Sequence, residues 1–135
     1  MTLERVNPAT LAKPSGFSHA VVADGGRVVF LAGQVALGAD GAIVGDTVAE
    51  QFERALGNLL EALRAAGGSP RDLASLTVYA VDLGDYREQA REIGLAWRRL
   101  VGREYPAMTG IGVTALWQPE AMIEISAVAA VPPNG

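Results

Sequence analysis

Glu124 is the residue of this sequence with the clearest potential for acid–base chemistry. It lies in an apolar run over residues 122–128, a pattern that predicts a half-buried strand. An ionised carboxylate is costly in such a place unless it is paired or reaches water. A glutamate kept there is suited to take a proton from a water molecule as a general base. The alternative interpretation is an exposed glutamate at a sheet edge with no part in chemistry.

The strand expected before Glu124 indicates open space beside this carboxylate. A turn between strands over residues 109–116 and 122–128 makes a hairpin, and its register places Glu124 opposite Thr114. Gly110 then lies on the face of Glu124, where the missing side chain leaves room for a ligand. The pattern therefore predicts a cleft next to the glutamate.

His19 is the only histidine in the chain. Histidine changes its charge near neutral pH, so His19 is a candidate acid, base or hydrogen-bond donor near the cleft. The alternative is a structural histidine whose ring is satisfied by its neighbours. Ser18 precedes it on an expected strand and faces the other way, which argues against a Ser–His nucleophilic pair.

Metals, cofactors and nucleic acids are not expected as partners. A single histidine and the absence of cysteine leave no metal-ligand spacing, and no phosphate-binding glycine loop joins a strand to a helix. The net charge of −4 disfavours nucleic acid, which requires a basic footprint. The densest basic group is Arg98, Arg99 and Arg103. A solvated helix end is favoured over a phosphate site there, because cations are favourable near a helix C-terminus.

Length and composition predict one domain over residues 1–135 with its own core, since no linker or repeat divides the chain. Half of the residues are apolar and 19% are charged, a balance that excludes disorder. No secretory signal is expected at the N-terminus, and no apolar run approaches the roughly 20 residues of a membrane span. A cytoplasmic protein with no membrane partner is expected.

Periodicity and turn residues predict the elements. Residues 21–31 carry two β-branched runs around an Asp-Gly-Gly turn, a pattern typical of a hairpin. Thr47 and Glu50 have the spacing of a capping box, and the apolar stripe of the following helix ends at Gly67. A strand over residues 76–81 comes next.

A second helix is predicted to begin at Asp85 and to end at Gly102. The resulting order is hairpin, helix, strand, helix, hairpin. This order predicts an α+β fold in which both helices pack on one face of a sheet. The other face then needs cover, and self-association is expected if that face is apolar.

Five segments resemble the RidA/YjgF superfamily in their order and spacing. They are Gly16-Phe17-Ser18-His19-Ala20-Val21, Phe30-Leu31-Ala32-Gly33-Gln34, residues 46–60 with Gln51, Ala55, Leu56 and Asn58, Tyr105-Pro106-Ala107-Met108-Thr109, and Ile123-Glu124-Ile125. The resemblance implies a chorismate-mutase-like α+β fold and a homotrimer with ligand clefts between subunits. In the deaminating members of the superfamily, an arginine and a backbone amide hold the carboxylate of a 2-imino acid. A glutamate, here Glu124, positions the attacking water.

The chain departs from the family pattern where the carboxylate would be held. The arginine position is Met108, the tyrosine is Phe17, the serine before Gly-Gln is Ala32 and a frequent asparagine is Ala90. A thioether offers only apolar surface, whereas arginine offers a charged fork for both oxygens. Each charge-assisted hydrogen bond contributes about 1.5–3 kcal/mol. Deaminase activity on 2-iminopropanoate is therefore expected to be weak or absent.

Two interpretations of Met108 stay open. One is simple core packing. The other is a cleft adapted to a neutral or apolar ligand, whose binding residues are then Phe17, Leu31, Ala32, Gly33, Met108, Thr109, Gly110 and Trp117.

The leading functional hypothesis is hydrolysis of a small imine or enamine in this cleft, with Glu124 and His19 as catalytic residues and no cofactor. The alternative is a non-catalytic trimer that binds a small metabolite or a protein. A ribonucleolytic function, implied by some family members, is disfavoured by the acidic charge.

Overall fold

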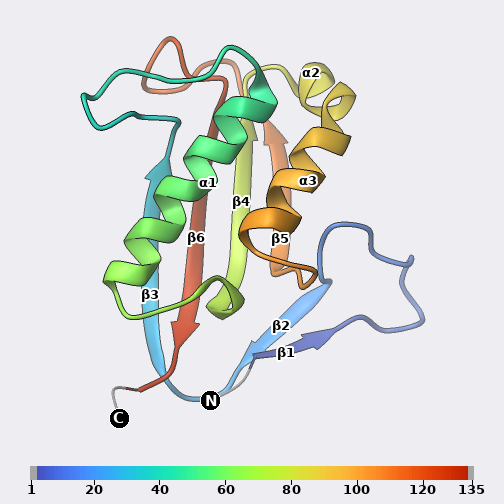
Figure 1. The fold of residues 1–135 in the computed structure, drawn as a ribbon. Helices are drawn as coiled ribbons and strands as arrows, with labels where there is room; N and C mark the ends of the chain where they lie inside the picture. The colour runs from blue at the N-terminus through green and yellow to red at the C-terminus, as the bar shows by residue number, and fades with distance from the viewer. Residues whose placement is uncertain (1–2, 134–135) are drawn as a thin grey trace.

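A four-stranded sheet covered on one face by helices forms the body of the protein, and a small two-stranded sheet lies beside it (Figure 1). The computed structural model describes residues 3–133. The strands are β1 (Leu3–Val6), β2 (Ala20–Ala23), β3 (Arg27–Gln34), β4 (Leu73–Ala80), β5 (Ala107–Gly112) and β6 (Ile123–Val131). The helices are α1 (Val48–Ala65), the short α2 (Leu83–Glu88) and α3 (Ala90–Leu100), with a 3-10 turn at Pro70–Asp72.

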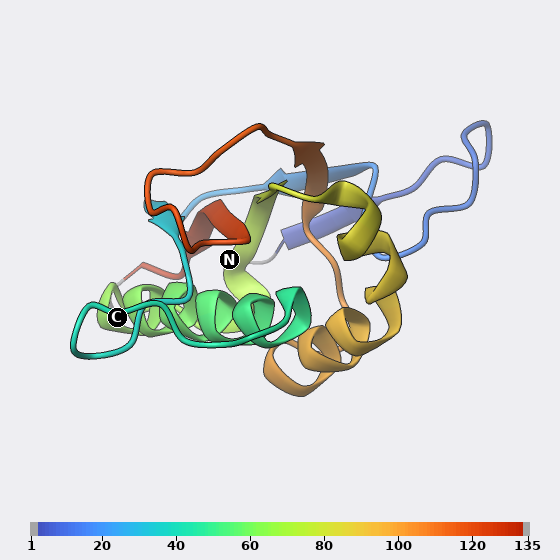
Figure 2. The same ribbon diagram turned by 90° about the horizontal axis from the view of Figure 1, so that it is seen from above.

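The large sheet has the strand order β3-β6-β4-β5. β6 runs antiparallel to both of its neighbours, and β5 runs parallel to β4. Alternate β6 residues, among them Ile123 and Ile125, are fully buried in the core beneath α1. Figure 2 shows the helices on one side of the sheet, so the predicted α+β fold is confirmed.

Neither predicted hairpin forms, and this is the main correction to the sequence analysis. β2 pairs with β1 rather than with β3, and β3 pairs with β6. At the other end of the chain, β4 lies between β5 and β6. The physical reason is the crossover through α2 and α3, which returns the chain to the end of the sheet where β4 began and makes β5 parallel to β4.

The predicted first helix is present with its capping box. The Thr47 Oγ1 atom accepts a hydrogen bond from the Glu50 amide at 3.1 Å, and the Glu50 carboxylate accepts one from the Thr47 amide at 3.2 Å. These bonds satisfy amides that a helix start leaves unpaired. The helix buries one stripe, formed by Val48, Phe52, Ala55, Leu56, Leu59, Leu60 and Leu63.

The predicted second helix is two helices that meet at Gln89. α2 begins earlier than expected because Asp82, not Asp85, is its N-cap and accepts a hydrogen bond from the Asp85 amide at 3.0 Å. The Gln89 side chain accepts a hydrogen bond from the Ala49 amide at 3.0 Å and donates one to Asp85. The break therefore ties α3 to the first turn of α1.

The sheet face that points away from the helices is uncovered within one chain. On it, Glu124 is paired with Tyr79, and Ser126 with Thr77. Phe30 of β3 is 81% exposed. None of the helices within residues 3–133 is long and apolar enough to cross a membrane.

Candidate functional site

Glu124 lies on the uncovered sheet face, next to the end of β3. Its side chain is half-buried, and a Cβ added at Gly33 would stand 2.8 Å from its carboxyl carbon. Neither ion pair found among residues 3–133 involves this carboxylate. The Glu124 carboxylate can occupy this position only because Gly33 has no side chain.

The sequence pattern predicts different neighbours for Glu124. Thr114 lies beyond the end of β5 and does not face Glu124, whose cross-strand partner is Tyr79. Gly110 pairs with the buried Val78, so the pleat places it on the helix side of the sheet. The expected glycine beside the carboxylate exists, but it is Gly33 of β3.

A β-bulge interrupts β3 next to this position. The register of β3 against β6 shifts between Leu31 and Gln34, which leaves Ala32 and Gly33 in the irregular step. Bulges redirect the backbone and are common beside active sites. Ala32 and Gly33 are exposed here, whereas Leu31 is 7% exposed and packs in the core.

A second group of predicted residues meets elsewhere. Where the segment before β2 crosses β4 and β5, a pocket of about 340 Å³ is lined by Phe17, His19, Met108 and Thr109, among others. Ser18 forms the crossing point, because its amide donates to the Pro106 carbonyl at 3.0 Å. Ala107, the next residue, is the bridge partner of Ser18 and also lines the pocket.

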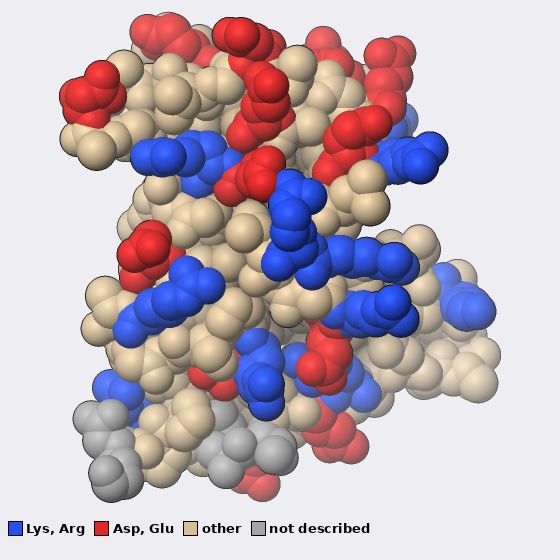
Figure 3. Space-filling model, in the orientation of Figure 1, with Lys and Arg blue, Asp and Glu red and all other residues tan. Residues whose placement is uncertain are grey.

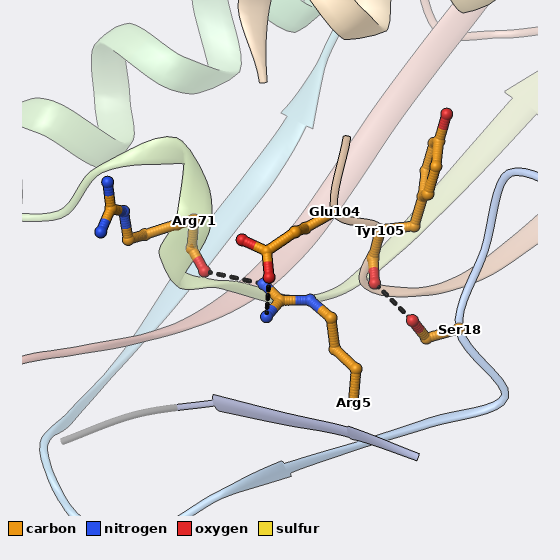
Figure 4. A network of polar contacts seen from close by, with 5 residues as sticks. All are labelled: Arg5, Ser18, Arg71, Glu104 and Tyr105. Carbon is orange, nitrogen blue, oxygen red and sulfur yellow. Dashed lines mark hydrogen bonds and ion pairs between the residues drawn. The ribbon is translucent and has the colours of Figure 1, made fainter. Parts of the chain in front are cut away.

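Side-chain tethers hold this crossing in place, and they were not foreseen from the sequence (Figure 4). The buried Ser18 hydroxyl donates to the Tyr105 carbonyl at 2.7 Å. Arg5 of β1 pairs with Glu104 at 2.9 Å and donates to the Arg71 carbonyl at 3.3 Å. The small sheet is thereby fixed to the loop that leads into β5.

The His19 ring bonds to a backbone carbonyl, and the His19 amide donates to the Asn7 side chain at 2.7 Å. The His19 Nε2 atom lies 2.7 Å from the Ala12 carbonyl oxygen, and since a carbonyl can only accept, Nε2 carries the proton. The ring meets Phe17 edge-on at a centroid distance of 5.0 Å. The Ser18 hydroxyl bonds to the Tyr105 carbonyl. The expectation that Ser18 and His19 do not form a nucleophilic pair is therefore met.

Met108 and Trp117 lie in very different surroundings. Met108 pairs with the buried Leu76, packs against the core and borders two pockets. Trp117 is 91% exposed in the loop between β5 and β6 and lines neither of these pockets.

The buried Gln51 positions the start of the strand that carries Glu124. Its side-chain oxygen accepts a hydrogen bond from the Met122 amide at 2.8 Å. Its side-chain nitrogen donates to the carbonyls of Gly45 and Glu120 at 3.2 and 3.3 Å. One side chain of α1 therefore ties together two loops and the beginning of β6.

Charge on the helix-covered face follows the helix axes (Figure 3). Acidic side chains gather near the helix starts and basic ones toward the ends, as the helix dipole favours. Arg99 of α3 pairs with Glu53 of α1. Among residues 3–133, no three His, Asp or Glu side chains lie together as metal ligands would.

Within one described chain, the predicted site residues therefore form two groups. Glu124 and Gly33 lie on the uncovered sheet face, whereas Phe17, His19, Met108 and Thr109 meet at the outer edge strand β5. None of the pockets lined by the second group includes Glu124.

The fold is that of a known family of small α+β proteins. The family model described as endoribonuclease L-PSP matches residues 8–131, and the chain belongs to this family, the RidA/YjgF family of the sequence analysis.

Its relatives include both named deaminases and proteins without an assigned activity. A human 2-iminobutanoate/2-iminopropanoate deaminase is 31% identical over 84% of this chain and 78% of its own length. A RutC family protein of Pyrococcus abyssi is 31% identical over 87% of this chain and 88% of its own. The crystal structure of YyfB, a Rid family protein of unknown function from Yersinia pestis, has a TM-score of 0.86 at 38% identity and covers 97% of this chain and all of its own.

Proposed function

We propose that this protein hydrolyses small imines or enamines that carry no carboxylate, with Glu124 as the base that activates water. The observation that carries the proposal is the position of Glu124: a half-buried carboxylate without an ion-pair partner in the described chain, placed against Gly33. An unpaired carboxylate there can accept a proton from water.

The reaction balances with this one base. Glu124 takes a proton from water, the resulting hydroxide attacks the imine carbon, and the protonated glutamate returns the proton to the nitrogen. Glu124 then takes the hydroxyl proton of the carbinolamine and passes it to the amino nitrogen, so that the carbon–nitrogen bond breaks and ammonia and a carbonyl compound are released. An enamine enters the same route after it tautomerises to the imine. The human relative's name, an imine deaminase, supports this class of reaction.

The exclusion of carboxylate substrates follows from Met108. It lies at the family's arginine position and packs against apolar side chains. The pocket that it shares with Phe17 and His19 is lined by no lysine or arginine. His19 donates to a backbone carbonyl, so we assign it a positioning role for Phe17 rather than proton transfer.

We also propose that the uncovered sheet face is covered by further copies of the chain in a homotrimer. Val28 and Phe30 are 62% and 81% exposed on β3, close to the strand that carries Glu124. Large exposed apolar side chains on one face mark an association surface. Such packing shelters Glu124 and allows a ligand pocket of one subunit to reach the glutamate of its neighbour.

Light scattering after size exclusion tests this assembly. Wild type should elute with three times the mass of one chain, and Phe30→Asp should be monomeric and should lose turnover. A monomeric, fully active wild type overturns the assembly and the shared cleft together.

Glu124→Gln tests the chemistry, and Glu61→Gln, an equivalent change on the exposed side of α1, is its matched control. The substrate is the imine formed in situ when an amine oxidase acts on 1-phenylethylamine, and ammonia release is followed. Glu124→Gln should lower kcat by about 100-fold or more, the range of a general base. The control should equal wild type. Equal rates for wild type and Glu124→Gln exclude the mechanism.

A non-catalytic binding protein is the second candidate, favoured by the engaged ring of His19 and by the replaced polar positions. It predicts ligand binding without acceleration of any imine hydrolysis, in wild type and Glu124→Gln alike.

A further inference from the structure

Helix α1 packs over β3 and β6, the two strands that bring Gly33 and Glu124 together (Figure 1). Two amide side chains, Gln51 and Asn58, lie on one side of this helix, because seven residues make nearly two full turns. Both amides bond to backbone groups outside the helix. An apolar core packs without amides, and burial of an unbonded amide is costly. The role of these two side chains therefore lies in the backbone groups that they bind.

Asn58 holds the chain directly after β3. Its Nδ2 atom donates to the Val35 carbonyl at 3.1 Å and to the Leu37 carbonyl at 3.0 Å. The Leu37 amide donates to the Val35 carbonyl at 2.8 Å, which makes this segment a tight turn. Arg54 also donates to Leu37, but among the described side chains Asn58 alone bonds to the Val35 carbonyl. Val35 is buried and follows Gly33 by two residues, so the turn that Asn58 holds fixes the strand end beside the carboxylate.

Gln51 holds β6 at the corresponding place. Its side-chain oxygen accepts a hydrogen bond from the Met122 amide, and Met122 precedes Glu124 by two residues. Gln51 is 1% exposed, so water does not compete for this bond. One helix thus anchors both strands, each at two residues from the contact between Gly33 and Glu124.

The bulge in β3 makes the anchor at Asn58 necessary. The register of β3 against β6 shifts between Leu31 and Gln34, so the ladder is interrupted at Gly33. A strand end without regular ladder bonds needs another support if it is to keep one position. Asn58 provides this support from the helix, through the turn that begins at Val35.

We propose that Asn58 is a positioning residue for Glu124, on which it acts through the turn at Val35 and through Gly33. Loss of its two hydrogen bonds frees the end of β3, and Gly33 then no longer confines the carboxylate to one place. Confinement matters because a general base acts only on a water molecule within hydrogen-bond reach. The inference rests on the proposed function, since it concerns the base of that reaction.

The carboxyl ¹³C signal of Glu124 reports on its position without any substrate. Full-length protein labelled with side-chain ¹³C-glutamate gives this signal, which is identified by its loss in Glu124→Gln. Near neutral pH, Asn58→Leu should move the signal beyond its line width, because leucine has a similar size but donates no hydrogen bond. Asp72→Ala is the control, since it breaks a buried hydrogen bond at the far end of β4 and should leave the signal in place. An unmoved signal in Asn58→Leu overturns the proposal, and so does an equal shift in Asp72→Ala.

A kinetic cycle with Gly33→Ala provides the second test. Asn58→Leu should lower kcat for the imine of acetophenone by about tenfold or more, because a displaced base no longer meets its water. KM should change little, since the water and not the substrate loses its partner. In the Gly33→Ala background, where the carboxylate is already displaced, the same change should lower kcat by about twofold or less. Equal losses in the two backgrounds would mean that Asn58 does not act through Gly33, and would overturn the proposal.

Further variants separate positioning from stability. Asn58→Asp keeps the shape but turns an acceptor toward two carbonyl oxygens, so it should disturb the Glu124 signal and kcat at least as much as leucine does. It also serves as the test if Asn58→Leu does not fold. Asn58→Gln keeps the donor and should lie closer to wild type in both measurements, whereas Asp72→Ala should lower the unfolding temperature but retain wild-type kcat. A wild-type signal and kcat in Asn58→Asp contradicts the proposal.

Failure of this inference is distinguishable from failure of the proposed function. If the Glu124 signal moves in Asn58→Leu but wild type hydrolyses no imine, the positioning role stands and the chemistry fails. If hydrolysis depends on Glu124 but the signal and kcat of Asn58→Leu equal those of wild type, the chemistry stands and the positioning role fails.

Discussion

The carboxylate of Glu124 lies directly against the backbone of Gly33. A Cβ added at Gly33 would stand 2.8 Å from the carboxyl carbon, closer than such contacts occur in proteins. The glutamate and the glycine come from different strands, and the irregular register of β3 against β6 places Gly33 at this step. The position of the proposed base therefore depends on the missing side chain of a residue 91 positions earlier in the chain, 124 minus 33.

Gly33→Ala should therefore move the carboxylate while leaving the fold intact. The end of a glutamate side chain can swing away at little cost, so the free energy of unfolding should change by about 1 kcal/mol or less. Turnover should fall by about tenfold or more, because a displaced base no longer meets its water. Gly57→Ala on α1 is the control and should leave turnover unchanged. Wild-type kinetics in Gly33→Ala would show that the contact between Gly33 and Glu124 does not affect turnover.

Met108→Arg introduces the arginine that the family resemblance implies at this position, but in this chain the new side chain enters an apolar setting. Burial of an unpaired guanidinium is costly, so the variant should lose about 2 kcal/mol or more of unfolding free energy. Met108→Leu keeps the volume and should lose less than about 1.5 kcal/mol. Urea titrations of both variants give the comparison. A stable Met108→Arg protein with new activity on 2-iminopropanoate would mean that the side chain reaches the carboxylate site after all.

Gln51→Met keeps the length of a buried side chain but removes its hydrogen bonds. The Met122 amide and the carbonyls of Gly45 and Glu120 would lose their partner. Unsatisfied buried groups cost about 1–3 kcal/mol each, and water can reach some of them, so a total loss of about 2–3 kcal/mol is expected. Urea unfolding measures it. A loss below about 0.5 kcal/mol would indicate that this network contributes little.

Tyr86 should make the protein sensitive to alkali. Burial raises the pKa of its phenol above the unfolded value of 10.0, so the folded state holds the proton more tightly. The stability contributed by the neutral phenol is complete below pH 10 and is lost as the pH rises from there toward the folded pKa. Thermal unfolding at pH 9 and pH 11 should show a smaller decrease for Tyr86→Phe than for wild type. An equal decrease would mean that Tyr86 does not cause the alkaline loss.

Local patterns predicted the helices well and the strand partners poorly. The Thr47 capping box and the stripe of α1 depend on residues within one or two turns of each other, so the sequence contains the whole signal. Alternation in a strand reveals which side chains share a face, but it does not reveal the neighbouring strand. For this reason Glu124 was assigned the wrong cross-strand neighbour, Thr114 instead of Tyr79.

The candidate site could be predicted as a set of residues but not as an arrangement. The resemblance to a family identified Glu124 and Met108, whereas their separation onto two faces of the sheet depends on the topology. The bonds from Arg5 to Glu104 and from Ser18 to Tyr105 join residues 99 and 87 positions apart, and no local sequence pattern predicts them. The Trp97 indole nitrogen is buried without a hydrogen-bond partner among the described residues, and the sequence does not reveal this, because Trp97 belongs to an ordinary apolar helix stripe.

We propose that this chain keeps the base of its family and that apolar side chains stand where the family's arginine would hold a carboxylate. The ratio of kcat/KM for the imine of acetophenone to that for 2-iminopropanoate tests it most directly. Both imines are generated in situ, from 1-phenylethylamine and from alanine, and ammonia release is corrected for the uncatalysed rate. We predict a ratio of about 10 or more, which corresponds to at least about 1.4 kcal/mol of preference. A ratio below one would contradict the account, since Met108 and its neighbours would then be holding a carboxylate.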